Sequence, residues 1–184
     1  IYDYLLDVKF KISSKSFYQI NHDQCEKLYS LGFDFAELKK SDVILDAYCG
    51  IGTIGLIASK KVKEVYGVEI VKEAIVDAKN NARINKITNC HYECKDASEH
   101  MLDKKFDVIF VDPPRKGLDT KFINALMKNK PNKIVYISCD VGTFARDIAI
   151  LKKLYKVEKI SFVDMFPRTY HIETVCLLTL KNQK

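Results

Sequence analysis

Asp46-Ala47-Tyr48-Cys49-Gly50-Ile51-Gly52-Thr53-Ile54-Gly55 is the stretch from which the fold of this chain is predicted. The apolar run before it, 42–45, is typical of a buried strand, and residues 56–62 after it favour a helix. The three glycines have G-x-G-x-x-G spacing, which permits a tight turn and close approach of a ligand beside a helix N-terminus. This pattern predicts a nucleotide-type pocket. NAD enzymes and methyltransferases share it, and a tight turn without a ligand is the remaining alternative.

Strands and helices alternate on both sides of this stretch. Strands are expected at 42–47, 64–69, 89–94, 106–111, 133–138, 157–165 and 173–180, and helices at about 54–61, 71–84, 97–102, 119–129 and 142–153. The alternation predicts an α/β domain over residues 41–184, with a Rossmann-like, seven-stranded, mostly parallel sheet and helices on both faces. No helix separates the last two strands, so we expect them to pair as a hairpin and to leave one antiparallel strand.

Residues 1–40 precede the alternating region and are interpreted as an N-terminal extension that contributes to the cofactor site. Alternating apolar residues predict a strand from Leu5 to Ile12. Asn21 is expected to cap a helix that runs from His22 to about Leu31, and Gly32 is expected to end it.

Composition narrows the class of protein. The chain has 184 residues and a net charge of +6, which favours an anionic partner, although scattered lysines also suit a solvated surface. No apolar run is long enough to cross a membrane, and no signal peptide opens the chain. Six cysteines without a C-x-x-C pair argue against zinc or disulfide frameworks and favour a reducing compartment. We therefore expect a cytoplasmic, monomeric protein with no metal ion.

Ligands of open α/β sheets bind beyond the carboxyl ends of the strands, and polar residues stand at several of these ends. The first strand supplies Asp46 and Tyr48. The second supplies Glu69, which is placed to bind ribose hydroxyls or, alternatively, is a surface glutamate that starts a helix. The third ends at Asp96, which is suited to accept from an adenine amino group or to cap the next helix.

The last three strand ends carry the residues best suited to catalysis. The segment Asp112-Pro113-Pro114-Arg115-Lys116-Gly117 is a stiff loop, because two prolines fix φ and remove donors. Cys139 is either a small buried residue or a nucleophile whose thiolate is favoured by Arg115, Lys116 or Arg146. Glu173 starts the last strand and is otherwise a salt-bridged edge carboxylate.

Five motifs in order give the chain a specific resemblance. They are Ser16-Phe17-Tyr18-Gln19-Ile20-Asn21, the Asp46–Thr53 stretch, Asp112–Gly117, Ser138-Cys139 with Thr143-Phe144-Ala145-Arg146-Asp147, and Met165-Phe166-Pro167 through His171-Ile172-Glu173. Over nearly its whole length the chain resembles the RNA uracil-C5 methyltransferases, which have a class I methyltransferase fold and use S-adenosylmethionine to make 5-methyluridine in ribosomal and transfer RNA.

The resemblance implies a set of roles. Gln19, Tyr48, Glu69 and Asp112 would contact the cofactor, and Gly50 and Asp96 join them from the strand-end analysis. Cys139 would be the nucleophile that adds to C6 of uracil, and Glu173 the base that removes the C5 proton. RNA is the implied partner, with ribosomal RNA favoured over transfer RNA. Arg115, Lys116, Arg146 and Arg168 are candidates for phosphate contacts, and Phe17, Tyr18 and Tyr170 are candidates for base stacking or for the core.

The chain departs from the family pattern in several places. Asp140-Val141-Gly142 follows Cys139 where many members have Asn-Pro, and Arg168 stands where histidine is frequent. The RNA-binding β-barrel and the iron–sulfur cysteine cluster of some members are absent, so we expect this chain to be the catalytic domain of such an enzyme.

Three other functions fit parts of the sequence. An NAD-dependent oxidoreductase would explain the glycines and Glu69 but leaves Asp112–Gly117 and Cys139 without roles. An amino-methyltransferase of adenine or cytosine would share Asp112-Pro113-Pro114, but it needs an aromatic residue where Arg115 stands. A non-catalytic RNA-binding module would suit the lysines, but it leaves the residues at the strand ends unexplained.

Overall fold

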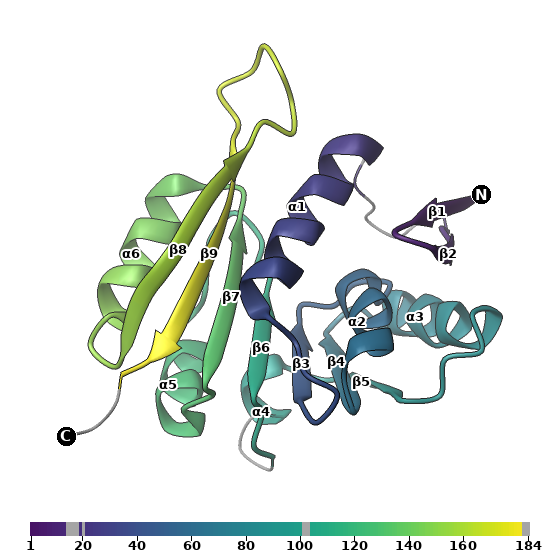
Figure 1. Ribbon diagram of the computed structural model, residues 1–184, viewed down its shortest axis with the longest axis horizontal. Coiled ribbons are helices and arrows are strands. Elements are labelled where there is room, and N and C mark those ends of the chain that lie inside the picture. The colour runs from purple at the N-terminus through teal and green to yellow at the C-terminus, as the bar shows by residue number, and fades with distance from the viewer. Residues whose placement is uncertain (14–18, 20, 101–103, 182–184) are drawn as a thin grey trace.

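The computed structural model of the protein describes residues 1–13, 19, 21–100 and 104–181. Its main sheet contains β3 (Val43–Ala47), β4 (Glu64–Glu69), β5 (Cys90–Cys94), β6 (Val108–Val111), β7 (Lys133–Ser138), β8 (Tyr155–Val163) and β9 (Glu173–Leu180). The strand order is β5-β4-β3-β6-β7-β9-β8 (Figure 1). Only β9 runs antiparallel to its neighbours β7 and β8, which confirms the expected hairpin and the mostly parallel sheet.

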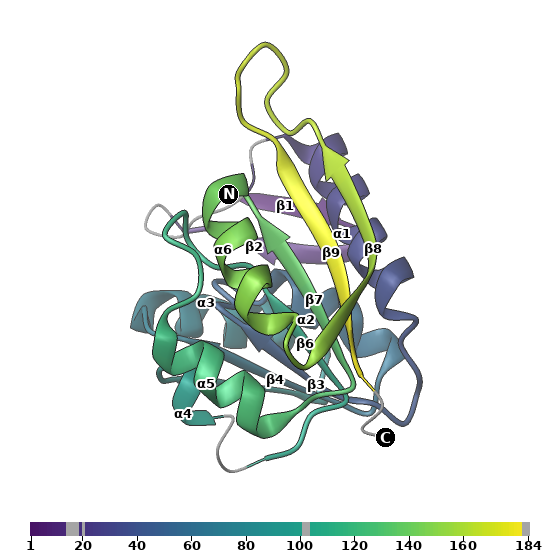
Figure 2. The ribbon, with the colours of Figure 1, turned by 90° about the vertical axis from the view of Figure 1, so that its left-hand side faces the viewer.

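Helices cover both faces of this sheet (Figures 1 and 2). On one face lie α1 (His22–Ala36), α2 (Thr53–Ala58) with the short 3-10 helix η1 (Ser59–Lys61), and α3 (Lys72–Ile84). On the other lie α4 (Ala97–His100), α5 (Thr120–Asn129) and α6 (Val141–Leu151). Each layer has its own apolar core against the sheet, because the strands are buried on both faces. Within the described residues, no helix is both long enough and apolar enough to span a bilayer.

The strand expected from Leu5 to Ile12 is confirmed over residues 8–11 only. The segment forms a hairpin of β1 (Tyr2–Leu5) and β2 (Val8–Lys11). Leu6 and Asp7 turn the chain with φ values of 46° and 62°, in the left-handed region that leucine rarely adopts. Contacts from distant residues support this turn, since Glu26 accepts from the Leu6 N–H at 3.1 Å and Lys60 donates to the Asp7 carbonyl at 3.1 Å. The sequence of the segment itself does not predict these contacts.

The free edge of β2 is paired by side chains of α3. Asn85 Oδ1 accepts from the Lys9 N–H at 2.9 Å, and Asn81 Oδ1 accepts from the Lys11 N–H at 2.8 Å. The Asn81 amide also donates to the carbonyl of Ile51 in the glycine turn at 3.3 Å. The hairpin is therefore fastened to the same helix that supports the glycine turn.

Helix α1 does not end at Gly32, as the sequence predicted, but continues to Ala36. A Cβ built on Gly32 would lie 3.5 Å from Val135 Cγ1, an ordinary contact distance. The buried face of the helix, which includes Leu28, Phe33 and Ala36, packs against the sheet on both sides of this glycine. Packing of this face outweighs the weak helix propensity of one glycine. Asn21 caps the helix as expected, and its Oδ1 accepts from Gln24 N at 3.3 Å.

The turn after β3 has the geometry that its glycines predict. Gly52 has φ of 84°, and a Cβ there would lie 2.6 Å from the Tyr92 hydroxyl. Buried Asp46 ties the end of β3 to α2, because its Oδ2 accepts from the Gly55 N–H at 2.8 Å. The turn is thus held close to the end of the sheet, where the main chain of Gly50 stays accessible.

Candidate active site

Four ionisable side chains lie on the α1 face of the sheet, along the edge where the parallel strands end and the antiparallel strand β9 begins. Because side chains alternate across a strand, a residue two positions from a core residue faces the same side. Ile44, Phe110, Ile137 and Val175 all belong to the core beneath α1. The residues two positions along from them are Asp46, Asp112, Cys139 and Glu173.

Cys139 and Glu173 are placed by the antiparallel ladder between β7 and β9. The ladder ends with the pair Ser138 and Thr174, so the next residues outward, Cys139 and Glu173, stand opposite each other. Cys139 is half-buried, and Glu173 is 6% exposed. Glu173 is therefore buried between two neighbouring strands and is not an exposed edge carboxylate.

These groups also influence one another electrostatically. Burial raises the pKa of the Cys139 thiol, and the carboxyl groups of Glu173 and Asp112 raise it further, while Arg115 lowers it. Burial raises the pKa of Glu173, and Arg115 again opposes the shift. Burial, together with Glu173 and Asp46, raises the pKa of Asp112 to about 8. Of the three cations considered as partners of a Cys139 thiolate, Arg115 favours the ionised form, but burial and the two carboxyl groups outweigh it.

A small cavity of about 60 Å³ lies beside this group, between the glycine turn and α1. Four of the residues predicted to bind a cofactor line it: Gln19, Tyr48, Gly50 and Asp112. Tyr48 is half-buried with φ of 64°, and its ring packs on Phe122 at 5.4 Å between centroids. The lining combines an aromatic ring, exposed main chain and polar groups, as small-molecule sites do.

The other two predicted cofactor residues, Glu69 and Asp96, are not part of this lining. Glu69 Oε2 accepts from Gly50 N at 3.3 Å, and its Oε1 accepts from Val71 N at 3.0 Å. It therefore braces the glycine turn from the end of β4. Asp96 accepts from Ser98 N at 2.8 Å and also from the Ser98 hydroxyl, as a residue at the start of α4 does.

Two further lining residues, Cys25 and Tyr29, come from α1 and were not predicted as site residues. They are one helical turn apart on the buried face of α1. Their only sequence signal is the apolar stripe of that helix, which also describes a plain core.

Two family models match the chain. The model described as tRNA (Uracil-5-)-methyltransferase matches residues 94–181, and the one described as methyltransferase small domain matches residues 33–136. An uncharacterized RNA methyltransferase of Staphylococcus aureus is 50% identical over 186 residues, which cover 98% of this chain and 41% of that protein. One from Halalkalibacterium halodurans is 47% identical, over 99% of this chain and 41% of its own length.

A solved structure agrees with these matches. The tRNA (uracil-54, C5)-methyltransferase of Pyrococcus abyssi, in complex with S-adenosyl-L-homocysteine, superposes with a TM-score of 0.86 at 37% identity. The match covers 97% of this chain and 44% of that one. This chain belongs to the RNA uracil-C5 methyltransferase family. It spans about two fifths of the length of the curated relatives that it matches.

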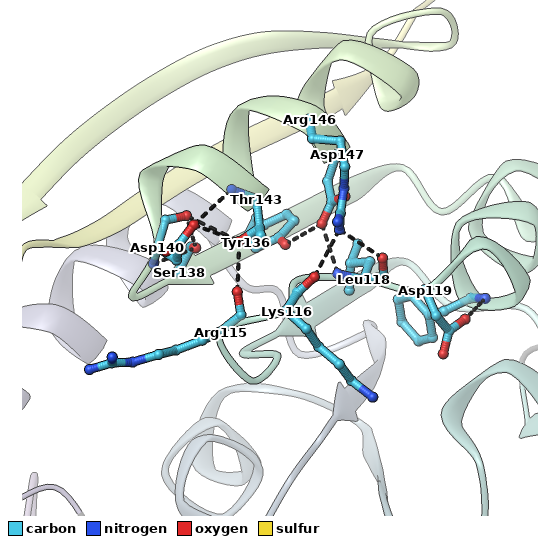
Figure 3. A network of polar contacts seen from close by, with 11 residues as sticks. Arg115, Lys116, Leu118, Asp119, Tyr136, Ser138, Asp140, Thr143, Arg146 and Asp147 are labelled. Carbon is cyan, nitrogen blue, oxygen red and sulfur yellow. Dashed lines mark hydrogen bonds and ion pairs between the residues drawn. The ribbon is translucent and has the colours of Figure 1, made fainter.

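The four basic residues predicted to contact RNA differ from one another in their surroundings. Arg115 and Lys116 are exposed on the loop after β6, and the Arg115 guanidinium lies 3.4 Å from His171 Nε2. Arg168 is exposed on the loop 164–172 between β8 and β9, which projects beyond the sheet (Figure 2). Arg146 instead uses its N–H groups within the protein, as Figure 3 shows.

Of the three aromatic residues predicted to stack on a base or to lie in the core, the structure describes one. Tyr170 is 89% exposed on the loop 164–172, so it is not a core residue, and its ring contacts His171 at 4.2 Å between centroids. Phe17 and Tyr18 lie outside the described residues, as does most of the Ser16–Asn21 motif.

Proposed function

We propose that this chain methylates C5 of uridine in RNA, with S-adenosylmethionine as methyl donor and Cys139 as nucleophile. The observation that carries the proposal is the placement of Cys139 opposite Glu173 at the end of the β7–β9 ladder, with Asp112 between this pair and the cavity. Two alternative functions need no nucleophile, namely an NAD-dependent oxidoreductase and a non-catalytic RNA-binding module. Neither of them assigns a role to Cys139 and Glu173.

The chemistry of uracil explains why these two residues belong together. C5 of uracil is a weak nucleophile, so the thiolate of Cys139 first adds to C6, and the C5=C6 electrons move onto the O4 carbonyl as an enolate. C5 then takes the methyl group that the sulfonium of the cofactor supplies. Glu173 removes the C5 proton, the double bond re-forms, and Cys139 leaves as a thiolate. A buried carboxylate with a raised pKa is a stronger proton acceptor than an exposed one.

The residues that line the cavity fit the proposed cofactor. The Tyr48 ring offers an apolar face, the Gly50 main chain permits close approach, and Gln19 and Asp112 supply polar groups. We assign Glu69, which braces Gly50, to the ribose hydroxyls, and Asp96 to the adenine amino group. The S-adenosyl-L-homocysteine complex of the Pyrococcus abyssi relative supports this choice of ligand.

The covalent step is tested with RNA that carries 5-fluorouridine. The native protein should methylate this RNA and then remain bonded to C6, because fluorine cannot be removed as a proton. Glu173→Gln should trap ordinary methylated RNA in the same way, and Cys139→Ala should form neither adduct nor product. Shifted bands on denaturing gels report the adducts.

Each result bears on a different part of the proposal. Methylation by Cys139→Ala at a near-native rate would refute the mechanism. Free turnover by Glu173→Gln would remove only the assignment of the base.

The class of RNA is a separate question. Resemblance alone favours ribosomal RNA, whereas the Pyrococcus abyssi relative is named for tRNA. Mapping 5-methyluridine in both RNAs from cells with and without the gene decides between them: loss from ribosomal RNA supports our preference, and loss from tRNA alone overturns it.

A further inference from the structure

Two adjacent charged residues of helix α6, Arg146 and Asp147, form hydrogen bonds to the loop 113–118 (Figure 3). Asp147 is fully buried, and its Oδ2 accepts from the Leu118 N–H at 2.7 Å and from the Tyr136 hydroxyl at 2.8 Å. Its Oδ1 accepts from Arg146 Nε at 2.8 Å. One carboxylate therefore joins strand β7, helix α6 and the loop after β6.

Arg146 adds two further hydrogen bonds to the loop. Its Nη2 donates to the main-chain carbonyls of Lys116 at 2.9 Å and Leu118 at 3.1 Å. These bonds, with the ion pair to Asp147, engage Nε and Nη2 of the guanidinium within the protein, while about half of the side chain stays exposed. A lysine in this place would keep the charge but lose the fork that makes several bonds at once.

Two neighbouring residues show how tightly the loop is held. Thr143 Oγ1 donates to the Arg115 carbonyl at 3.0 Å. Gly117 has φ of 73°, and a Cβ there would lie 2.6 Å from Asp147 Oδ2 and 2.7 Å from Arg146 Nη2. Only glycine permits this approach without displacing the ion pair.

The hydrogen bonds of Arg146 and Asp147 to the loop connect two parts of the candidate site. Helix α6 begins at Val141, two residues after Cys139, and Asp140 caps it by accepting from Thr143 N at 2.8 Å. The loop carries Arg115, whose side chain extends away from the network (Figure 3). Of the charged groups that act on the Cys139 thiol, Glu173 from β9 and Asp112 from the end of β6 oppose ionisation, and Arg115 favours it.

We propose that Arg146 and Asp147 are positioning residues that hold Arg115 in place beside Cys139 and Glu173. The proposal rests on the proposed function only for the roles of the last two residues. A purely structural ion pair would change stability when it is altered, but it would not change the reactivity of Cys139 through Arg115.

Alkylation of Cys139 by iodoacetamide, followed by peptide mass spectrometry over a range of pH, tests this without RNA or cofactor. The thiolate displaces iodide, so the rate below the pKa reports how far the thiol is ionised. Arg115→Ala should slow alkylation at a fixed pH by roughly two- to fivefold, the scale expected of an exposed charge. Arg146→Lys should slow it in the same direction, and the double variant should be no slower than Arg115→Ala.

Two further variants keep the test decisive. Arg83→Lys, an exposed arginine on α3, should leave the alkylation profile unchanged. Thr143→Val removes one bond to the loop at constant shape and should give a smaller slowing, which serves if Arg146→Lys does not fold by circular dichroism. An unchanged profile in folded Arg146→Lys, or effects of Arg115→Ala and Arg146→Lys that simply multiply, would overturn the proposal. Absence of methyl transfer by the native protein would instead count against the proposed function alone.

Discussion

Asp112 combines burial with proximity to two other carboxyl groups, Glu173 and Asp46. Each of these effects disfavours its ionised form, which raises its pKa from 3.8 to about 8. Between pH 3.8 and about pH 8, Asp112 is protonated in the folded protein but ionised in the unfolded chain. The free energy of unfolding therefore falls as pH rises through this range, and the contribution of Asp112 to stability is lost near pH 8.

We predict that Asp112→Asn flattens this dependence, because an amide does not titrate. The difference in unfolding free energy between about pH 5 and about pH 8.5 should shrink by at least about 1 kcal/mol, which is less than the worth of one pKa unit. Urea titrations at the two pH values measure it. Asp34→Asn, at an exposed residue of α1, is the matched control and should leave the difference unchanged. An equal slope in Asp112→Asn and the native chain would contradict the prediction.

At this scale the sequence predicted residues whose position follows from strand ends. The sequence predicted that Cys139, Glu173 and Asp112 lie at strand ends along one edge of the sheet, because strand ends are local features. Their catalytic roles came from the resemblance and stay predictions. Arg146 shows the limit. Its bonds to the main-chain carbonyls of Lys116 and Leu118 could not be predicted, because those carbonyls belong to another element of the fold. Its contact with RNA phosphate stays a prediction.

At the scale of elements, Gly32 and Gly67 make a matched pair of glycines on buried surfaces. We predict that Gly32→Ala stabilises the protein by roughly 0.5–1 kcal/mol, because alanine favours the helix and its Cβ has ordinary contact distance there. Gly67→Ala should destabilise it by roughly 1–3 kcal/mol through overpacking, since its Cβ would lie 2.4 Å from the Tyr92 ring. Urea midpoints of both variants at constant m value give the answer, and destabilisation by Gly32→Ala would show that the helix has no room.

Strands and helices with strong periodicity were predicted to within a few residues, while the N-terminal region was not. The alternating run after Leu5 satisfies the pattern of one strand and equally that of a hairpin, because both place the same residues inside. Tertiary contacts from Glu26 and Lys60 decide for the hairpin. The length of α1 was likewise set by packing on the sheet rather than by the propensity of Gly32.

For the whole molecule, ligand binding and stability are linked. If S-adenosyl-L-homocysteine binds only the native state, it should stabilise the chain by about 2.7 kcal/mol at a hundred times its Kd. Glu69→Ala should weaken its binding more than Asp96→Ala, because Glu69 braces Gly50 in the lining of the cavity. Thermal shifts and calorimetric titration measure both effects, with NAD as the control ligand. Stabilisation by NAD instead would favour the oxidoreductase, and unchanged affinity in Glu69→Ala would remove the ribose assignment.

The interior place of β9 has a consequence for synthesis on the ribosome. β9 is the last of the strands to be made, yet it lies between β7 and β8. Until it emerges, β8 has no partner in the sheet, and β7 exposes an unpaired edge to neighbouring nascent chains. Glu173 is made with the same strand, so Cys139, the proposed nucleophile, meets its proposed base only when β9 has paired in the sheet. A ribosome-bound chain that ends before β9 should therefore be both aggregation-prone and inactive.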